Sequence, residues 1–252
     1  MSVIVEDRGN GVVSLKINRP EKRNALNAEM ISVLRDNARA LSDNDDLRVV
    51  VLEAAGDLVF SAGADINELS RLDASTARAF ITNLYEAIQA VRDIPVPVIC
   101  KLQGPCIGGA MELAAACDLR IASTNATFCM PEVRVGIPSV IQAVLLPRLM
   151  GKGRADWLVL SGDVIDATTA YDWGFVEKLV GPNQLQETTN QAIHSILSSA
   201  PLAVRTQKQL CRGWDDQSTD DAIAASINAF ASSFDTNEPA GYLASIKKKV
   251  SG

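Results

Sequence analysis

The sequence predicts an α/β core followed by a helical C-terminal region. Short apolar runs typical of buried strands alternate with amphipathic stretches as far as about residue 180, and beyond it the pattern is helical. Hydrophobic residues make up 47% of the 252 residues, which is enough to bury a full core and excludes disorder as the main state. We therefore divide the chain into a core, residues 1–180, and a helical region, residues 181–252.

The expected strands are short, and turn signals separate them. Gly9-Asn10-Gly11 lies between the first two and predicts a β-hairpin. The β-branched run at 48–54 is too continuous for a half-exposed strand, so we expect it to be buried on both faces. The expected strands are residues 3–6, 12–17, 48–54, 98–102, 118–123, 126–129 and 176–180.

The expected helices follow from apolar stripes and from residues that begin or end a helix. Asn27 is a suitable N-cap for the first helix, and Pro95 and Pro97 end the second. Ser139 is a candidate N-cap for a later helix that ends before Gly151. The expected helices are residues 28–41, 78–93, 110–117, 139–149, 183–199, 202–211, 219–234 and 239–249.

The stretch from Gly104 to Asp118 has the order strand, glycine turn, helix. The pair Gly108-Gly109 lets a ligand approach bare backbone, and the helix start presents unpaired N–H groups. Glu112 lies in the first turn of this helix among apolar neighbours. It is either a simple partner of the helix dipole or a buried carboxylate with a function, and the apolar surroundings favour the second interpretation.

Charge and cysteine usage narrow the class of protein. The net charge of −6 and the pI near 4.9 argue against nucleic acid as the main partner, because phosphate binding needs a basic face. The charged N-terminus does not resemble a signal peptide, and no apolar run is long enough to span a membrane. The five cysteines form no C-x-x-C pair, which indicates free, mostly buried thiols in a reducing cytoplasm.

Several catalytic motifs are missing from the sequence. The single histidine, His194, lies in a polar helical stretch and is interpreted as a surface residue, which disfavours a Ser-His-Asp hydrolase and most zinc sites. There is no Walker loop, dinucleotide glycine fingerprint or G-x-S-x-G elbow. Carboxylates remain as the candidate catalytic groups.

Three glycine- or proline-containing loops, residues 61–65, 104–112 and 130–138, follow apolar strands and are expected to converge. The first two offer backbone N–H groups that could hold an oxyanion. The third carries Glu132, which could share acid and base roles with Glu112. The alternative for Glu132 is a solvated carboxylate paired with Arg134, and the pattern alone leaves both open.

Taken together, the motifs resemble the enoyl-CoA hydratase/isomerase superfamily, the crotonases, over nearly the whole chain. Each motif is weak alone, but their order and spacing are specific. The matching segments are Asn18-Arg-Pro20, Asn24-Ala-Leu-Asn27, Val50-Val-Leu-Glu-Ala-Ala-Gly56, Phe60-Ser-Ala-Gly-Ala-Asp65, Gly108-Gly-Ala-Met-Glu-Leu-Ala114, Cys117-Asp118, Pro131-Glu132, Gly136-Ile-Pro138, Leu146-Pro-Arg-Leu149, Ser161-Gly162 and Trp173-Gly-Phe-Val176.

The resemblance implies a spiral of repeated ββα units, with CoA and the active site in residues 1–180 and a C-terminal region that builds trimers or dimers of trimers. It implies a thioester oxygen held by the N–H groups of Ala64 and Gly109, and a water held by Glu112 and Glu132. Coenzyme A is then part of the substrate, and no metal or other cofactor is expected. The CoA-binding positions that it implies are Arg23, Ala25, Leu26, Ala62, Asp65, Ile66 and Gly108.

Two segments depart from the family pattern. The family usually has Gly-Ala-Gly-Gly-Thr after the third loop, where this chain has Ser139-Val-Ile-Gln-Ala143. We expect Ser139, Val140 and Ile141 to line the acyl pocket and to narrow it. Ser245 stands where the family often has a Phe that contacts adenine.

Three functions remain open from the sequence. Because both glutamates are present, the resemblance favours an enoyl-CoA hydratase. A Δ3,Δ2-enoyl-CoA isomerase is the alternative, since those enzymes commonly keep only the second glutamate. A catalytically silent CoA- or RNA-binding module is a third interpretation, disfavoured by the acidic net charge and the two glutamates.

Overall fold

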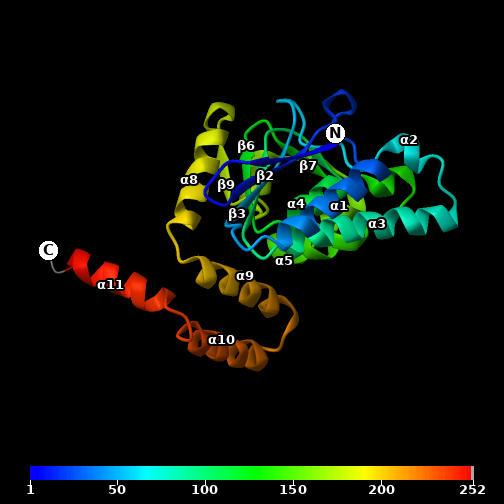
Figure 1. The fold of residues 1–252 in the computed structure, drawn as a ribbon. Helices are drawn as coiled ribbons and strands as arrows, with labels where there is room; N and C mark the ends of the chain where they lie inside the picture. The colour runs from blue at the N-terminus through cyan, green and yellow to red at the C-terminus, as the bar shows by residue number, and fades with distance from the viewer. Residues whose placement is uncertain (251–252) are drawn as a thin grey trace.

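Two β-sheets and the helices around them form the fold of this computed structural model, which describes residues 1–250 and the side chains of residues 1–247 (Figure 1). The large sheet has the order β1-β2-β3-β4-β6-β9, and the small sheet has the order β5-β7-β8. The strands of the large sheet are β1 (Val3–Asp7), β2 (Val12–Ile17), β3 (Val49–Ala54), β4 (Val98–Leu102), β6 (Leu119–Ser123) and β9 (Lys178–Val180). Those of the small sheet are β5 (Cys106–Ile107), β7 (Thr127–Cys129) and β8 (Ile165–Asp166).

The large sheet is parallel except at its first strand. Strands β1 and β2 form the predicted antiparallel hairpin, and β2, β3, β4, β6 and β9 then pair in parallel. The first five residues of β3 are all buried, which confirms that this strand is covered on both faces. Its alternate residues divide between two clusters, with Val50 and Leu52 in the main core and Val49 in a smaller cluster under α8 (Leu185–Leu197).

The chain winds as a spiral in which a large-sheet strand, a small-sheet strand and a helix repeat. Strand β3 leads to Ser61, which bridges to Cys106 at the edge of the small sheet, and then to α3 (Ala74–Asp93). Strand β4 leads to β5 and α4 (Gly109–Ala116), and β6 leads to β7 and a pair of 3-10 helices, η2 (Glu132–Val135) and η3 (Ile141–Leu145). These repeats are the ββα units that the family resemblance implies.

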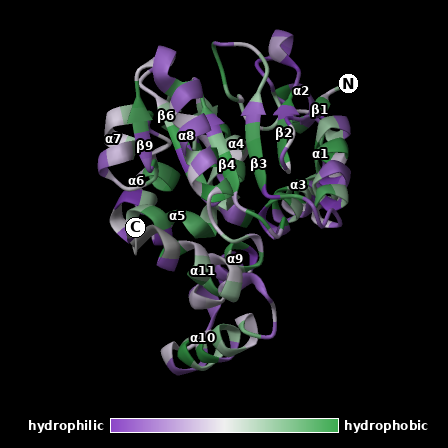
Figure 2. Cartoon of the chain, turned by 60° about the vertical axis from the view of Figure 1, so that its left-hand side comes forward, coloured by the Kyte–Doolittle hydropathy of each residue, from purple (hydrophilic) through white to green (hydrophobic). Residues whose placement is uncertain are grey.

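Helices α1 (Ala28–Ser42) and α3 pack against each other on the side of the sheet opposite α8 (Figures 1 and 2). The side chain of Asn27 accepts a hydrogen bond from the N–H of Met30, which confirms it as the N-cap of α1. Helix α3 begins four residues before the predicted start, because Asp73 and Thr76 form a capping box there.

The predicted helix at residues 139–149 is confirmed only in its C-terminal part, where α5 (Leu146–Met150) follows η3 directly. The predicted N-cap is wrong, because Val140 rather than Ser139 precedes η3. The Ser139 hydroxyl does not cap a helix because it donates to the carboxylate of Glu132. The short elements absent from the sequence prediction are α2 (Ile66–Leu69), α6 (Lys152–Ser161), α7 (Ala167–Asp172), β5, β8 and two further 3-10 turns, at Pro20–Lys22 and Pro182–Gln184.

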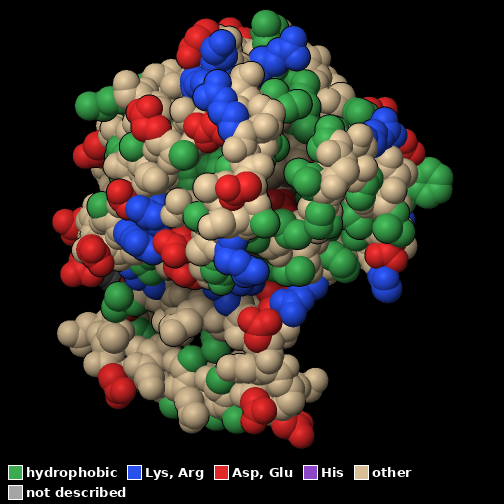
Figure 3. Space-filling model, turned by 90° about the vertical axis from the view of Figure 1, so that its right-hand side faces the viewer, with side chains coloured by type: hydrophobic (Ala, Val, Ile, Leu, Met, Phe, Trp, Pro, Cys, Tyr) green, Lys and Arg blue, Asp and Glu red, His purple; other side chains and the backbone are tan. Residues whose placement is uncertain are grey.

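The C-terminal helices α9 (Pro201–Asp216), α10 (Thr219–Ser233) and α11 (Glu238–Val250) extend away from the core and form a lobe beneath it (Figures 1 and 3). Lys208 on α9 joins this lobe to the core by donating to the carbonyl of Val96 at 2.7 Å and to Asp118 at 2.6 Å. Helix α8, in contrast, packs on the sheet, and its His194 is exposed as predicted. Within the part of the chain that the structure describes, no helix is long and apolar enough to cross a membrane.

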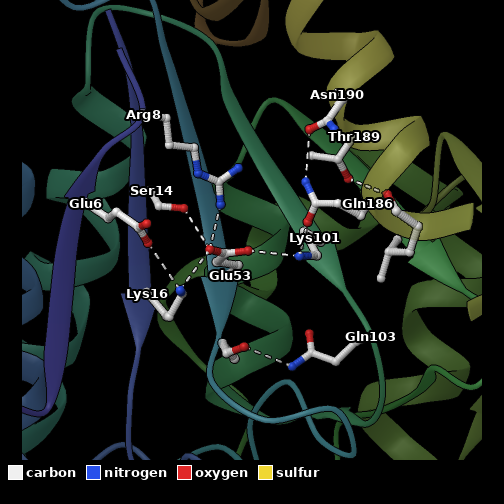
Figure 4. A network of polar contacts seen from close by, with 12 residues as sticks. Glu6, Arg8, Ser14, Lys16, Glu53, Lys101, Gln103, Gln186, Thr189 and Asn190 are labelled. Carbon is white, nitrogen blue, oxygen red and sulfur yellow. Dashed lines mark hydrogen bonds and ion pairs between the residues drawn. The ribbon is translucent and has the colours of Figure 1, made fainter. Parts of the chain in front are cut away.

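A polar network centred on Glu53 ties β2, β3 and β4 together on the α8 side of the sheet (Figure 4). The Glu53 side chain is 5% exposed and accepts from Ser14 at 2.7 Å, Arg8 at 2.7 Å and Lys101 at 2.9 Å. Burial acts to raise the pKa of Glu53, but the hydrogen bonds from Ser14 and Lys101 and the charges of Lys101 and Arg8 outweigh it and lower the pKa to about 2.

Replacing Glu53 by Gln should therefore destabilise the fold at neutral pH. The unfolded chain binds a proton at Glu53 more readily than the folded chain does, so this stabilisation is present above about pH 4.5 and is lost as the pH falls towards about 2. We expect Glu53→Gln to cost about 2–3 kcal/mol at pH 7, or roughly 5–10 °C in Tm, measured by thermal denaturation. A wild-type and variant difference that does not shrink between pH 5 and pH 2 would contradict this account.

Candidate active site

The loop at residues 23–26 lies directly against the loop at residues 62–65. The N–H of Ala62 donates to the carbonyl of Arg23 at 3.0 Å, and the N–H of Leu26 donates to that of Gly63 at 2.8 Å. The N–H of Asp65 returns a bond to the Leu26 carbonyl at 3.0 Å. Two of the segments predicted to bind CoA are therefore joined backbone to backbone.

Asp65 has a structural partner that the sequence analysis missed. The guanidinium of Arg19 donates to Asp65 Oδ2 at 2.6 Å and to the Ala25 carbonyl at 3.2 Å. The hydrogen bond from Arg19 is the main cause that lowers the pKa of Asp65. Since the Asp65 carboxylate also caps α2, its side chain holds the two loops in place, while Ile66 beside it is 67% exposed.

The second loop meets the first at a contact that only glycine allows. Gly63 has a φ of +79°, and a Cβ there would lie 2.5 Å from the Ile107 carbonyl oxygen and 3.5 Å from the Gly109 nitrogen. The N–H of Ala64, next to Gly63, and the N–H of Gly109 donate no hydrogen bond to any residue that the structure describes. Two unpaired N–H groups thus lie on adjacent segments, as expected for an oxyanion hole.

The third loop brings Glu132 over the same glycine turn. The N–H of Gly108 donates to the Cys129 carbonyl at 2.9 Å, which fixes the end of β7 beside α4. Gly108 has a φ of +55°, and a Cβ there would lie 2.4 Å from Glu132 Oε1. Any larger residue would therefore displace the carboxylate. Arg134 does not pair with Glu132, because its guanidinium contacts Asp163 and the Ser161 carbonyl.

Glu112 lies on the first turn of α4 and is only 3% exposed. Its Oε1 accepts the N–H of Ala143 at 3.0 Å, and a Cβ at Gly109 would lie 3.8 Å from its Oε2. Burial raises the pKa of Glu112 to about 8; the charge of Glu132 adds to the rise, and backbone N–H groups of Ala143 and Val140 oppose it. The two carboxyls thus interact across the Gly108-Gly109 turn, with the proton favoured on Glu112 at neutral pH.

The segment that departs from the family pattern contacts both carboxyls. Ser139 donates to Glu132 Oε2 at 2.8 Å, and Ala143, which the sequence analysis did not select, donates to Glu112. Ile141 packs against the main core with a φ of +41°, while Val140 is 37% exposed. That Ser139, Val140 and Ile141 line an acyl pocket stays a prediction.

Two unpaired N–H groups and two unlike carboxyls can perform acyl chemistry. The N–H groups can polarise a carbonyl oxygen and stabilise the negative charge that develops on it. A buried protonated carboxyl beside a more exposed one can hold a water between them, one giving and one accepting protons. The resemblance implies four catalytic positions, and all of them lie on or beside the Gly108-Gly109 turn. They are Ala64, Gly109, Glu112 and Glu132.

The known proteins that this chain is similar to share one family description. The model of the enoyl-CoA hydratase/isomerase family matches residues 7–248. The chain is 35% identical over 236 residues to the crotonyl-CoA hydratase of Syntrophomonas wolfei, across 93% of this chain and 91% of that protein. It is 33% identical to the short-chain-enoyl-CoA hydratase of Clostridium acetobutylicum, across 100% of this chain and 97% of that protein. The crystal structure of an enoyl-CoA hydratase from Bacillus anthracis matches with a TM-score of 0.95 at 28% identity, across 99% of this chain and 97% of that one.

The burial of Glu112 predicts that Glu112→Gln stabilises the protein at alkaline pH. Between about pH 4.5 and pH 8 the folded chain binds a proton at Glu112 that the unfolded chain has released, so stability falls as the pH rises through this window. Above it, ionising the buried carboxyl costs the wild type roughly 2–5 kcal/mol, and a neutral glutamine avoids that cost. Denaturant titration at pH 5 and pH 9 should show the variant gaining mainly at pH 9.

Glu53→Gln is the matched control, since it removes a carboxylate whose ionised form the fold stabilises. It should lose stability at pH 9, where Glu112→Gln gains. Equal destabilisation by both substitutions at pH 9 would show that the Glu112 site carries no cost of buried charge.

Proposed function

The chain belongs to the enoyl-CoA hydratase/isomerase family, and from that premise we propose that it hydrates short-chain 2-enoyl-CoA thioesters. It is an enzyme of the hydro-lyase type, and its substrate is an acyl-CoA thioester. One observation supports hydration most directly: Glu112 and Glu132 are both present and interact across one glycine turn beside two unpaired N–H groups. The short-chain preference rests on the printed names of the two relatives.

In the proposed reaction, the thioester oxygen accepts hydrogen bonds from the N–H groups of Ala64 and Gly109. These donors and the N-terminal dipole of α4 draw electron density from the conjugated double bond onto that oxygen. The β-carbon becomes electrophilic as a result. Removing one such donor typically costs about 3 kcal/mol of transition-state stabilisation.

The water that attacks the β-carbon is held between Glu112 and Glu132. Because burial raises the pKa of Glu112 to about 8, we propose that Glu112 carries the proton of the resting pair. The Glu132 carboxylate accepts a proton from the water as the water oxygen bonds to the β-carbon, and Glu112 gives its proton to the α-carbon. Return of the proton from Glu132 to Glu112 then restores the resting pair. That the reaction needs no metal and no second cofactor stays a prediction.

Coenzyme A is proposed to lie along the joined loops at residues 23–26 and 62–66. Arg23 is exposed, and Ala62 and Ile66 face solvent at least in part, so these positions are open to a ligand. Ala25, Leu26 and Asp65 are buried, which indicates that they contribute through their backbone or by positioning the loops. Gly108 is proposed to contribute bare backbone at the reacting end.

The runner-up activity is Δ3,Δ2-enoyl-CoA isomerisation, which needs one base to move a proton between two carbons. The same oxyanion donors would serve isomerisation, so the two activities are distinguished by whether the reaction needs Glu112. A catalytically silent CoA- or RNA-binding module is the third candidate, and the net charge of −6 disfavours RNA.

We further propose a homotrimer or a dimer of trimers formed through the C-terminal lobe. Large apolar side chains on α10 are open to solvent in the single chain, with Ile227 64% and Phe230 71% exposed, and a partner subunit would cover them. A cytoplasmic location is proposed from the four buried free thiols, which a reducing compartment would preserve. The predicted loss of an adenine contact at Ser245 also stays a proposal.

Incubation with crotonyl-CoA and with a 3-enoyl-CoA tests the activity. Loss of the absorbance of the conjugated thioester reports hydration, and its appearance from the 3-enoyl substrate reports isomerisation. We expect Glu112→Gln and Glu132→Gln each to lower the hydration rate by at least ~100-fold, the usual size for a lost acid or base, with acyl-CoA still bound. Isomerase activity that survives Glu112→Gln but not Glu132→Gln would favour the runner-up, and acyl-CoA binding without any turnover would favour the silent module.

A second prediction concerns Ile141, whose β-branched side chain is held at a φ of +41°. Ile141→Gly removes both the strain of roughly 1–3 kcal/mol and the side chain, so we expect activity to shift towards bulkier enoyl-CoA substrates with little net loss of stability. Relative kcat/KM values across chain lengths, measured beside Tm, check this. An unchanged profile would place Ile141 in the core rather than at the acyl group.

A further inference from the structure

Ser139 fixes one of the two oxygens of the Glu132 carboxylate. Its hydroxyl donates to Glu132 Oε2 at 2.8 Å, while the other oxygen lies over Gly108, where a Cβ would be 2.4 Å away. A hydroxyl has a single hydrogen to donate, and Ser139 gives it to this carboxylate. The orientation of the Glu132 carboxyl is therefore set by a glycine on one side and a hydroxyl on the other.

The Ser139 hydroxyl bonds to the Glu132 carboxylate and does not cap the helix that follows. Serine before a helix commonly caps it, but η3 begins with Val140 at its N-cap and no side-chain bond. The turn that follows is strained at Ile141, and the same turn presents the Ala143 N–H to Glu112. Strain of this kind persists only where the surroundings impose it. One turn thus supplies a hydroxyl donor to one carboxyl and a backbone donor to the other.

The other charged and titratable groups that the structure describes near Glu132 do not stabilise the negative charge of its carboxylate. Burial, and after it the charge of Glu132, raises the pKa values of Glu112 on α4 and of the Cys129 thiol on β7, so neither group stabilises that charge. Arg134 on η2 is engaged by Asp163 and the Ser161 carbonyl. Within residues 1–247, Ser139 is the one group that donates a hydrogen bond to the Glu132 carboxylate.

We infer that Ser139 is a positioning residue for hydration: its hydroxyl holds the Glu132 carboxylate in the orientation in which it accepts a proton from water, and its hydrogen bond stabilises the charge on that carboxylate. A hydrogen bond to the charged form of a carboxylate favours that form. Without it, the two carboxyls would compete for the proton more evenly, and fewer molecules would carry the charge on the group that accepts a proton from water. This inference rests on the proposed hydratase function.

The test is the pH dependence of kcat/KM for crotonyl-CoA in the wild type, Ser139→Ala and Ser139→Thr. Ser139→Ala removes the donor and keeps the Cβ, so the acid limb of the profile should move to higher pH by about one unit, a roughly tenfold loss of kcat/KM on that limb. Ser139→Thr keeps a hydroxyl, so its acid limb should stay at the wild-type pH whatever its kcat. Ser139→Gly, which also lacks the donor, serves as the second variant if Ser139→Ala folds poorly.

A structural role would give a different result: both Ser139→Ala and Ser139→Thr would lower kcat/KM equally at every pH, with Tm falling in parallel. A wild-type acid limb in Ser139→Ala overturns the inference while leaving the hydratase function intact. If the wild type hydrates no enoyl-CoA, the proposed function fails. The role of Ser139 can then still be tested by infrared titration of the glutamate carboxyls in the full-length protein. Identical titration curves for the wild type and Ser139→Ala would overturn the inference about Ser139.

Discussion

The close approach of three loops at two glycines is the constraint on which the rest of the site depends. A Cβ at Gly63 would collide with the Ile107 carbonyl, and a Cβ at Gly108 would collide with the Glu132 carboxylate. Both residues also have positive φ, so neither position accepts an ordinary L-residue without strain. Because these contacts exist, the N–H groups of Ala64 and Gly109 lie on adjacent segments, and Glu132 reaches the turn that carries Glu112. The spiral of ββα units is the framework that delivers each loop to that point.

Two buried glutamates show how the same side chain serves opposite purposes. Glu53 is surrounded by Ser14, Arg8 and Lys101, and its ionised form stabilises the sheet. Glu112 is buried in an apolar helix with only backbone donors, so its ionised form is disfavoured and its proton is retained near neutral pH. A buried carboxyl without a cationic partner lowers the stability of the fold. Such groups are found mainly at functional sites, where their proton takes part in the reaction. The fold therefore supports Glu53 as a structural ion and keeps Glu112 protonated, the state in which the proposed reaction uses it.

The turn from Ser139 to Ala143 is where the sequence departs from the pattern that the resemblance implies. Its backbone is strained at Ile141, and its donors reach both carboxyls. Because this turn contacts both carboxyls and is also predicted to line the acyl pocket, it can change substrate preference and proton placement together. Substitutions in this turn therefore bear on both properties.

The sequence by itself determined the α/β class, the burial of β3 and the N-cap at Asn27, because these depend on local periodicity and side-chain chemistry. It also selected Glu112 and Glu132 as the candidate catalytic pair. The start of α3 was misplaced although its capping box at Asp73 and Thr76 is a local pattern, and Ser139 caps no helix because its hydroxyl bonds to Glu132. Arg19 and Ala143 could not be selected, because their partners lie 46 and 31 residues away in the chain. Only the tertiary structure decided that the pKa of Glu112 is raised to about 8. Burial and neighbouring charge cause this shift, and both arise when distant segments pack together.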